Sequence, residues 1–138
     1  MRAVIDTNVL ISGMINPDGT PGRIVDMLRT GSLTAVIDDR IFTEYARVLR
    51  RPYFAQYFHP VEREQLVDYL RHNTECIIAT SRCTGLPDPL DAPFLESALT
   101  SEVPLITGNL KHFPRSAAAG CRILTPKEFL ESLDTSRS

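Results

Sequence analysis

Three acidic residues, Asp6, Glu44 and Asp91, have the side-chain chemistry that could assemble a divalent-metal site. Successive members of this series are 38 and 47 positions apart, so only the fold can bring them together. Carboxylates that converge repel one another unless a proton or a cation compensates their charge. Mg²⁺ and Mn²⁺ are the natural cations, because both prefer oxygen ligands. A metal held this way can polarise a phosphodiester and generate hydroxide from bound water.

The length and composition of the chain limit the alternatives. It has 138 residues, of which 43% are hydrophobic and 23% are charged, and these values are typical of one globular domain. Seventeen acidic and fifteen basic residues give a formal net charge of −2, which supplies no positive field to hold a nucleic acid by charge alone. A nucleic-acid partner would therefore need another cation, and a bound metal would supply it.

The cysteine content and the hydropathy pattern indicate a cytoplasmic protein. The three cysteines are odd in number and fit neither a disulfide framework nor a paired zinc motif. The first residues are too polar for a signal peptide, and no stretch approaches the roughly 20 apolar residues of a membrane span. We therefore expect a reducing compartment and no membrane association.

Short apolar runs alternate with segments of helical periodicity along the chain. Strands are expected at 3–5, 34–37, 76–79, 103–106 and 122–124. Helices are expected to begin near residues 20, 38, 60, 91 and 125. These elements predict a single domain over residues 1–133, followed by a frayed polar tail at 134–138.

Strands that alternate with helices predict a parallel sheet covered on both faces, because parallel neighbours need crossover connections. Functional groups in such sheets gather beyond the carboxyl ends of the strands. Asp6 directly follows the first expected strand, Glu44 lies in the helix after the second, and Asp91 opens the helix before the fourth. The predicted topology therefore favours a shared acidic site.

Four segments resemble the motifs of PIN-domain ribonucleases, in the order in which that family carries them. The first is the V-I-D-T-N-V-L run at 4–10, and the others lie at 41–45, 88–95 and 103–109. The likeness runs from about residue 2 to residue 130. Within the family, it is greatest to stand-alone prokaryotic toxins of toxin–antitoxin pairs.

The resemblance implies a three-layer α/β/α sandwich with a central parallel sheet and an acidic pocket that binds Mg²⁺ or Mn²⁺ to hydrolyse single-stranded RNA. It makes Asp6, Glu44 and Asp91 the metal-binding catalytic carboxylates. It also matches Asn8 to the polar residue beside the first carboxylate, and Thr107 to the hydroxyl residue of the fourth motif. A cognate antitoxin protein and a second copy in a homodimer are the protein partners that it implies.

One position departs from the family pattern. Many members have an aspartate where this chain has Asn109, so a charge is lost while one oxygen ligand survives. Asn109 could still orient a metal-bound water, but a second metal ion would be held more weakly. Asp88 could replace the missing charge, or it could only form the turn between Pro87 and Pro89.

The supporting residues also have purely structural interpretations. Asn8 could cap a helix, and Thr107 could only bond backbone groups at a strand end. Glu44 could form an ion pair with Arg47, which lies one helical turn away. These interpretations remain open beside the functional ones.

Two groups of basic residues could contact RNA phosphates, or could be plain solvated surface. They are Arg47, Arg50 and Arg51 on one helical face, and Lys111, His112 and Arg115 after the fourth motif. His112 has no cysteine or histidine at zinc spacing, so a zinc site is not expected.

Two other functions compete with a nuclease. A PIN fold with a weakened acidic site could bind RNA or a protein partner without cleavage, and Asn109 favours this alternative. The first motif also partly resembles the nucleophile loop of haloacid-dehalogenase phosphatases, but Asn8 stands where their chemistry needs a second aspartate. We therefore expect a metal-dependent endoribonuclease. Asp6 and Asp91 would hold the ion, and Glu44 would add a ligand or orient the attacking water.

Overall fold

The computed structural model describes residues 1–136, and its five strands form one parallel sheet in the order β3-β2-β1-β4-β5. The strands are β1 (Arg2–Ile5), β2 (Thr34–Ile37), β3 (Glu75–Cys76), β4 (Leu105–Ile106) and β5 (Ile123–Leu124). The α-helices are α1 (Thr7–Ile15), α2 (Thr20–Thr30), α3 (Asp39–Leu49), α4 (Pro60–His72), α5 (Ala92–Ser101) and α6 (Pro126–Ser136). Three short 3₁₀ helices are η1 (Pro52–Gln56), η2 (Pro89–Asp91) and η3 (Leu110–His112).

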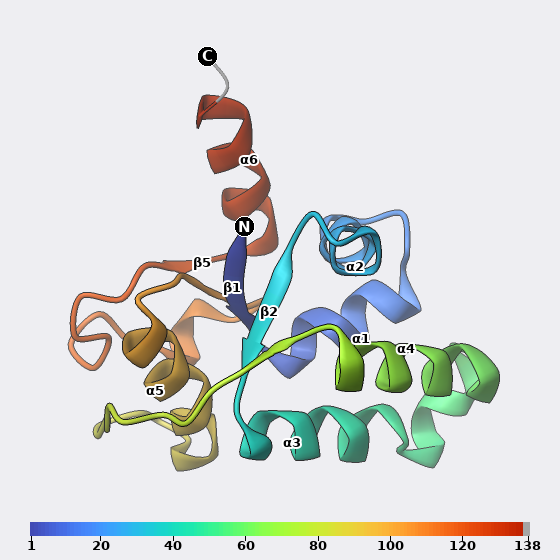
Figure 1. Ribbon diagram of the computed structural model, residues 1–138, viewed down its shortest axis with the longest axis horizontal. Helices are drawn as coiled ribbons and strands as arrows, with labels where there is room; N and C mark the ends of the chain where they lie inside the picture. The colour runs from blue at the N-terminus through green and yellow to red at the C-terminus, as the bar shows by residue number, and fades with distance from the viewer. Residues whose placement is uncertain (137–138) are drawn as a thin grey trace.

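Helices cover both faces of this sheet (Figure 1). In that view α5 lies on one side of the β1 and β2 arrows, and α2 lies on the other. Helix α5 packs on β1 and β2, while α1 packs on α2 and α2 packs in turn on α6. The predicted three-layer α/β/α sandwich with a central parallel sheet is therefore confirmed.

The central strands are buried on both faces, which explains their continuous apolar sequences. Ala3, Val4 and Ile5 of β1 have no exposed surface, and Val36 of β2 is equally buried. Strand β1 lies between β2 and β4. The residue that follows β1, Asp6, therefore emerges near the middle of the carboxyl edge of the sheet.

Helix α1 is not among the helices expected from the sequence, the first of which begins near residue 20. The helix is rich in apolar residues, and Gly13 lies within it. A Cβ at Gly13 would come within 2.6 Å of Val25 Cγ2, so the glycine lets α1 and α2 pack closely. Apolar residues also stand on the outer face of α1, where Ile15 is 38% exposed, so the amphipathic period by which a helix is recognised in a sequence is weak.

The ends of two other elements also differ from expectation. Strand β3 ends at Cys76 instead of residue 79, because the chain leaves the sheet edge after the Ile77 N–H donates to the Ile37 carbonyl at 2.8 Å. Ile78 is accordingly 87% exposed. Helix α6 continues to Ser136, because an existing helix gains a hydrogen bond with each added residue. The helix therefore runs past residue 133, and the frayed tail at 134–138 stays a prediction, of which residues 137–138 lie outside the described part of the chain.

The helix boundaries follow local chemistry. At the start of α6 the Thr125 N–H donates to Glu128 Oε1 at 3.0 Å, and the Glu128 N–H donates to Thr125 Oγ1 at 3.1 Å, which is the predicted capping box. Helix α2 ends at Gly31, whose φ of 83° is left-handed. None of the helices described over residues 1–136 is long and apolar enough to cross a membrane.

Candidate active site

The carboxyl ends of β1 and β4 bring Asp6 and Thr107 together, as expected for neighbouring parallel strands. The Thr107 hydroxyl donates a hydrogen bond of 2.7 Å to Asp6 Oδ2. Both side chains are buried, with Asp6 5% exposed and Thr107 fully covered. The Thr107 oxygen also accepts the Asn109 N–H at 3.1 Å, so the expected backbone bond at this strand end is present as well.

Asp6 is a buried carboxylate whose surroundings disfavour its charged form. It occupies the N-cap position of α1, yet its side chain makes no capping hydrogen bond. Burial raises the pKa of its carboxyl group above the usual range; the bond from Thr107 opposes that rise and repulsion from Glu44 adds to it. A cation would stabilise the charged form of such a group.

Helix α3 carries Glu44 to the same edge of the sheet. The half-buried Glu44 carboxylate accepts a hydrogen bond from the Thr7 hydroxyl, which adjoins Asp6 in the chain. The next residue, Tyr45, is buried and donates its hydroxyl hydrogen to the Ile5 carbonyl. These two bonds fix α3 against the end of β1. The described residues include no ion pair between Glu44 and Arg47, so that structural interpretation is wrong.

Asp91 reaches the site from the junction of η2 and α5. It stands at the N-cap position of α5 without a side-chain capping bond. Its Oδ2 atom is buried and has no hydrogen-bond partner. Burial, followed by repulsion from Asp6, raises the pKa of this carboxyl group to about 6, and Asp88 and Glu44 contribute to the rise. Asp6, Glu44 and Asp91 therefore lie within electrostatic range of one another.

His112 is the side chain that lies against Asp91. Its Nδ1 atom is 3.3 Å from Asp91 Oδ2, and the histidine side chain is 43% exposed while that of Asp91 is 15% exposed. The electrostatic influence of His112 lowers the pKa of both Asp91 and Asp6. Sequence analysis placed His112 only in a basic group, because no ligand spacing singles it out.

The other supporting residues make backbone contacts. Asn8 Oδ1 accepts the Gly108 N–H at 3.1 Å; because Asp6 holds the N-cap position of α1, the capping interpretation of Asn8 is wrong. Asn109 Oδ1 accepts the Lys111 N–H at 3.1 Å and caps η3. Asp88 is exposed, and its Oδ1 accepts the Leu90 N–H at 2.9 Å, which confirms its turn-forming role.

The donor set fits a divalent cation. Asp6, Glu44 and Asp91 offer carboxylate oxygens, a neighbouring carboxylate raises the pKa of Asp6 and of Asp91, and a buried oxygen without a partner is costly unless something binds it. Over residues 1–136, no three Asp, Glu, His or Cys side chains already converge tightly enough to hold an ion. Binding would therefore need a side-chain rotation.

The basic residues fall into two kinds. The Arg50 guanidinium donates to Glu64 of α4 at 2.8 and 3.1 Å, so it already serves an ion pair between helices. Arg47 in α3, Lys111 in η3 and Arg115 beyond it are exposed. Their contacts with RNA remain a prediction.

A second acidic cluster was missed by sequence analysis. Asp38 and Glu96 are 5% and 4% exposed, and Arg40 bridges them, with its Nη2 2.7 Å from Asp38 Oδ2 and its Nη1 2.9 Å from Glu96 Oε1. Backbone N–H groups of Ile41 and Cys83 add bonds of 3.0 and 3.1 Å. The available signal was a lone charge inside the apolar F-L-E-S-A-L run of α5.

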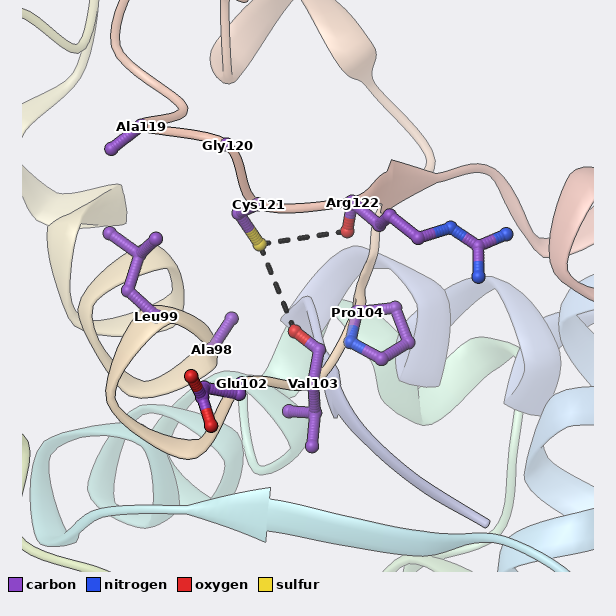
Figure 2. A pocket seen from close by; sticks show the side chains of 9 residues that line it. All are labelled: Ala98, Leu99, Glu102, Val103, Pro104, Ala119, Gly120, Cys121 and Arg122. Atoms are coloured by element: carbon purple, nitrogen blue, oxygen red, sulfur yellow. Dashed lines mark hydrogen bonds between the residues drawn. The ribbon is translucent and has the colours of Figure 1, made fainter.

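A hollow of about 540 Å³ lies away from these groups (Figure 2). The end of α5 and the segments leading into β4 and β5 line it, so it opens at the amino ends of those strands. The Cys121 sulfur donates weakly to the carbonyls of Val103 and Arg122. Burial raises the pKa of the Cys121 thiol, so a reactive thiolate is not favoured here.

The comparisons with known proteins agree with this fold. The chain is 26% identical over 143 residues to the uncharacterized protein MJ1680 of Methanocaldococcus jannaschii, covering 97% of this chain and 92% of that protein. It is similar in structure to VapBC2 from Rickettsia felis, solved bound to a DNA fragment from their promoter, with a TM-score of 0.59, 16% identity, and coverage of 91% of this chain and 98% of that one. The model of the PIN domain matches residues 2–111, which is most of the chain, so the chain belongs to the PIN domain family.

Proposed function

We propose that this protein is a metal-dependent endoribonuclease that hydrolyses phosphodiester bonds of single-stranded RNA. The observation that carries the proposal is the buried Asp91 Oδ2, which has no hydrogen-bond partner and lies within electrostatic range of Asp6 and Glu44. A buried acid that is paired with a half-exposed histidine, and with no lysine or arginine among the described residues, is costly to the fold and useful for binding a cation. Membership of the PIN domain family, which is typically composed of metal-dependent nucleases, supports the same conclusion.

The mechanism assigns a separate task to each side chain. Asp6 and Asp91 would hold Mg²⁺ or Mn²⁺, and Glu44 would add a ligand or orient the attacking water. When bound, the ion supplies the positive charge that polarises the phosphodiester and acidifies a water. Thr107 fixes the orientation of Asp6 through its 2.7 Å hydrogen bond. Asn8 holds the backbone of Gly108, and Asn109 and Asp88 shape the η3 and η2 turns beside the site.

We also propose the biological setting. The motif resemblance and the likeness in fold to VapBC2 support a toxin of a toxin–antitoxin pair, acting in the cytoplasm with a cognate antitoxin and as a homodimer. Exposed Arg47, Lys111 and Arg115 would contact RNA phosphates, whereas Arg50 is already occupied by Glu64.

One observation favours a second function, RNA or protein binding without cleavage. The Asn109 side chain brings no charge to the site, and its one oxygen already accepts the Lys111 N–H. The site then relies on the three carboxylates, and a second ion would be held weakly. If the three carboxylates do not hold enough metal for catalysis, the protein would bind RNA or a protein partner without cleaving RNA.

The experiment titrates the full-length protein with Mg²⁺ and Mn²⁺ against mixed single-stranded RNA and DNA oligonucleotides, with Asp6→Asn in parallel. The proposal predicts that RNA is cleaved only when metal is present and that Asp6→Asn abolishes cleavage. RNA retention without cleavage in both metals would establish the binding function instead. Equal activity of Asp6→Asn and wild type at matched Mg²⁺ would overturn the assignment of the site.

A further inference from the structure

We propose that His112 is an additional ligand of the divalent ion, beside Asp91, and that its ring nitrogen makes the site prefer Mn²⁺ to Mg²⁺. This inference rests on the proposed function, because it concerns the same ion. It assigns a site role to a residue that the family motifs do not mark in this sequence.

The first support is the separation of the two ligand atoms. His112 Nδ1 and Asp91 Oδ2 are 3.3 Å apart. Adjacent ligands of an octahedral ion with bonds of about 2.1 Å stand about 3.0 Å from each other. The observed pair is therefore close to the spacing of two neighbouring positions on one ion.

The second support is that the oxygen is buried and otherwise unused. Asp91 Oδ2 has no hydrogen-bond partner among the described residues, and His112 is the group beside it. A second His–Asp contact in the chain, between His72 and Asp68, shows what an incidental pair looks like. Those residues lie one turn apart on α4, at 3.7 Å, with side chains 65% and 75% exposed. The His112 pair instead joins two separate elements and covers a buried atom.

The third support is the construction of η3. The Asn109 side chain accepts the Lys111 N–H and so caps this short helix, whose last residue is His112. The Asn109 side-chain oxygen thus stabilises the turn that positions His112 near Asp91. The segment after β4 therefore delivers an imidazole to the site where an aspartate at 109 would have delivered a carboxylate.

The nitrogen ligand determines the metal preference. Both ions prefer oxygen ligands, but Mg²⁺ gives up its waters reluctantly, whereas Mn²⁺ is a first-row transition ion and accepts an imidazole nitrogen more readily than Mg²⁺ does. Loss of the imidazole should therefore weaken Mn²⁺ binding much more than Mg²⁺ binding. Replacement by a carboxylate should restore binding but remove the preference.

The experiment measures Mn²⁺ and Mg²⁺ binding by calorimetry and detects nitrogen coordination by electron spin-echo envelope modulation of bound Mn²⁺. It compares wild type with His112→Ala, His112→Asp and the matched control His72→Ala, all as full-length protein without RNA. We expect a ¹⁴N modulation in wild type and His72→Ala that is absent from both His112 variants. We also expect His112→Ala to weaken Mn²⁺ binding about tenfold or more, and Mg²⁺ binding less than about threefold. His112→Asp should bind both ions with no preference for Mn²⁺.

Two contrary results have different meanings. If wild type binds Mn²⁺ in a manner that Asp6→Asn abolishes, but shows no ¹⁴N modulation, His112 is only an ion-pair partner of Asp91 and this inference is overturned while the proposed function survives. If wild type binds neither ion at the site, and Asp6→Asn behaves identically, both fail. Thermal unfolding of the metal-free variants checks that His112→Ala and His112→Asp are folded, and His112→Asp keeps the test decisive if His112→Ala is not.

Discussion

Buried carboxylates occur in two regions of this molecule, and the two regions treat them differently. At Asp38 and Glu96 the Arg40 guanidinium bridges both acids at 2.7 and 2.9 Å, and backbone N–H groups add further bonds. At Asp6 and Asp91 no arginine or lysine forms an ion pair within the described residues. The half-exposed His112 is the sole basic side chain paired with Asp91 there.

This difference separates a structural role from a functional one. A carboxylate with its own cation and donors is already satisfied, and it stabilises the contact between α3 and α5. A carboxylate without them keeps an unmet need for positive charge, which the raised pKa values of Asp6 and Asp91 record. An external divalent ion would meet that need, so the uncompensated region is the candidate active site.

The largest expected effect comes from neutralising one acid in each region with an isosteric amide. Asp91→Asn removes a proposed metal ligand. Mutating a residue that only hydrogen-bonds to a metal ligand typically lowers metal affinity or activity about 10–100-fold, so we expect the loss of a ligand itself to reduce RNA cleavage about a thousandfold or more. The same change removes like-charge repulsion, so the free energy of unfolding should stay constant or rise. Cleavage assays and urea unfolding at neutral pH measure the two quantities.

Glu96→Gln is the matched variant in the compensated region. It leaves Arg40 with one carboxylate and should lower the free energy of unfolding while cleavage per folded molecule is retained. If instead Asp91→Asn destabilises the protein and Glu96→Gln abolishes cleavage, the two regions have been assigned the wrong way round.

Removing the guanidinium of Arg40, the cation of the compensated region, is expected to have the next largest effect. Arg40→Met should lower the free energy of unfolding by about 2 kcal/mol, because Asp38 and Glu96 remain buried without a counter-charge. The value lies below that of a fully buried pair, since the Arg40 side chain is 47% exposed. Chemical denaturation with Arg47→Met as the control measures it, because Arg47 is exposed and its loss should change stability by less than about 0.5 kcal/mol. Equal effects of the two substitutions would show that the bridge contributes nothing to stability.

The sequence predicted the parts of the molecule that depend on local signals. The apolar strands that precede Asp6 and Thr107, and the capping box at Thr125, are written in consecutive residues, so their positions could be found. Glu44 and Asp91 were identified because family motifs surround them. Helix α1 was not predicted because apolar residues such as Ile15 also stand on its exposed face, which weakens the amphipathic pattern.

The electrostatic partners could not be predicted, because they depend on contacts between distant segments. Arg40 meets Glu96 across 56 positions, and nothing in either local sequence indicates the pairing. His112 meets Asp91 only because η2 and η3 end at the same edge of the sheet. Composition suggested that a cation was needed, but only the fold shows which carboxylates lack one.

The smallest expected effect is the pH dependence of stability in the metal-free protein. The pKa of Asp91 is raised from its ordinary value of 3.8 to about 6, so its ionisation is less favourable in the folded than in the unfolded state. Below about pH 4 the carboxyl group is protonated in both states, so it does not affect the free energy of unfolding. As the pH rises from about 4 through about 6, the unfolded state loses its proton first and the free energy of unfolding falls. Asp6, Glu44 and Asp88 raise this pKa, and His112 opposes them.

Lowering the pH from 7 to 5 should therefore raise the free energy of unfolding of wild type by about 1 kcal/mol relative to Asp91→Asn. Urea denaturation of both proteins in chelator measures the difference, and the comparison cancels carboxylates elsewhere in the chain. Saturating Mn²⁺ should reverse the trend, because the ion binds the charged carboxylate of the folded state and stabilises it most at neutral pH. Parallel pH profiles for the two proteins in chelator would mean that Asp91 is already compensated, and the contrast with Asp38 and Glu96 would then disappear.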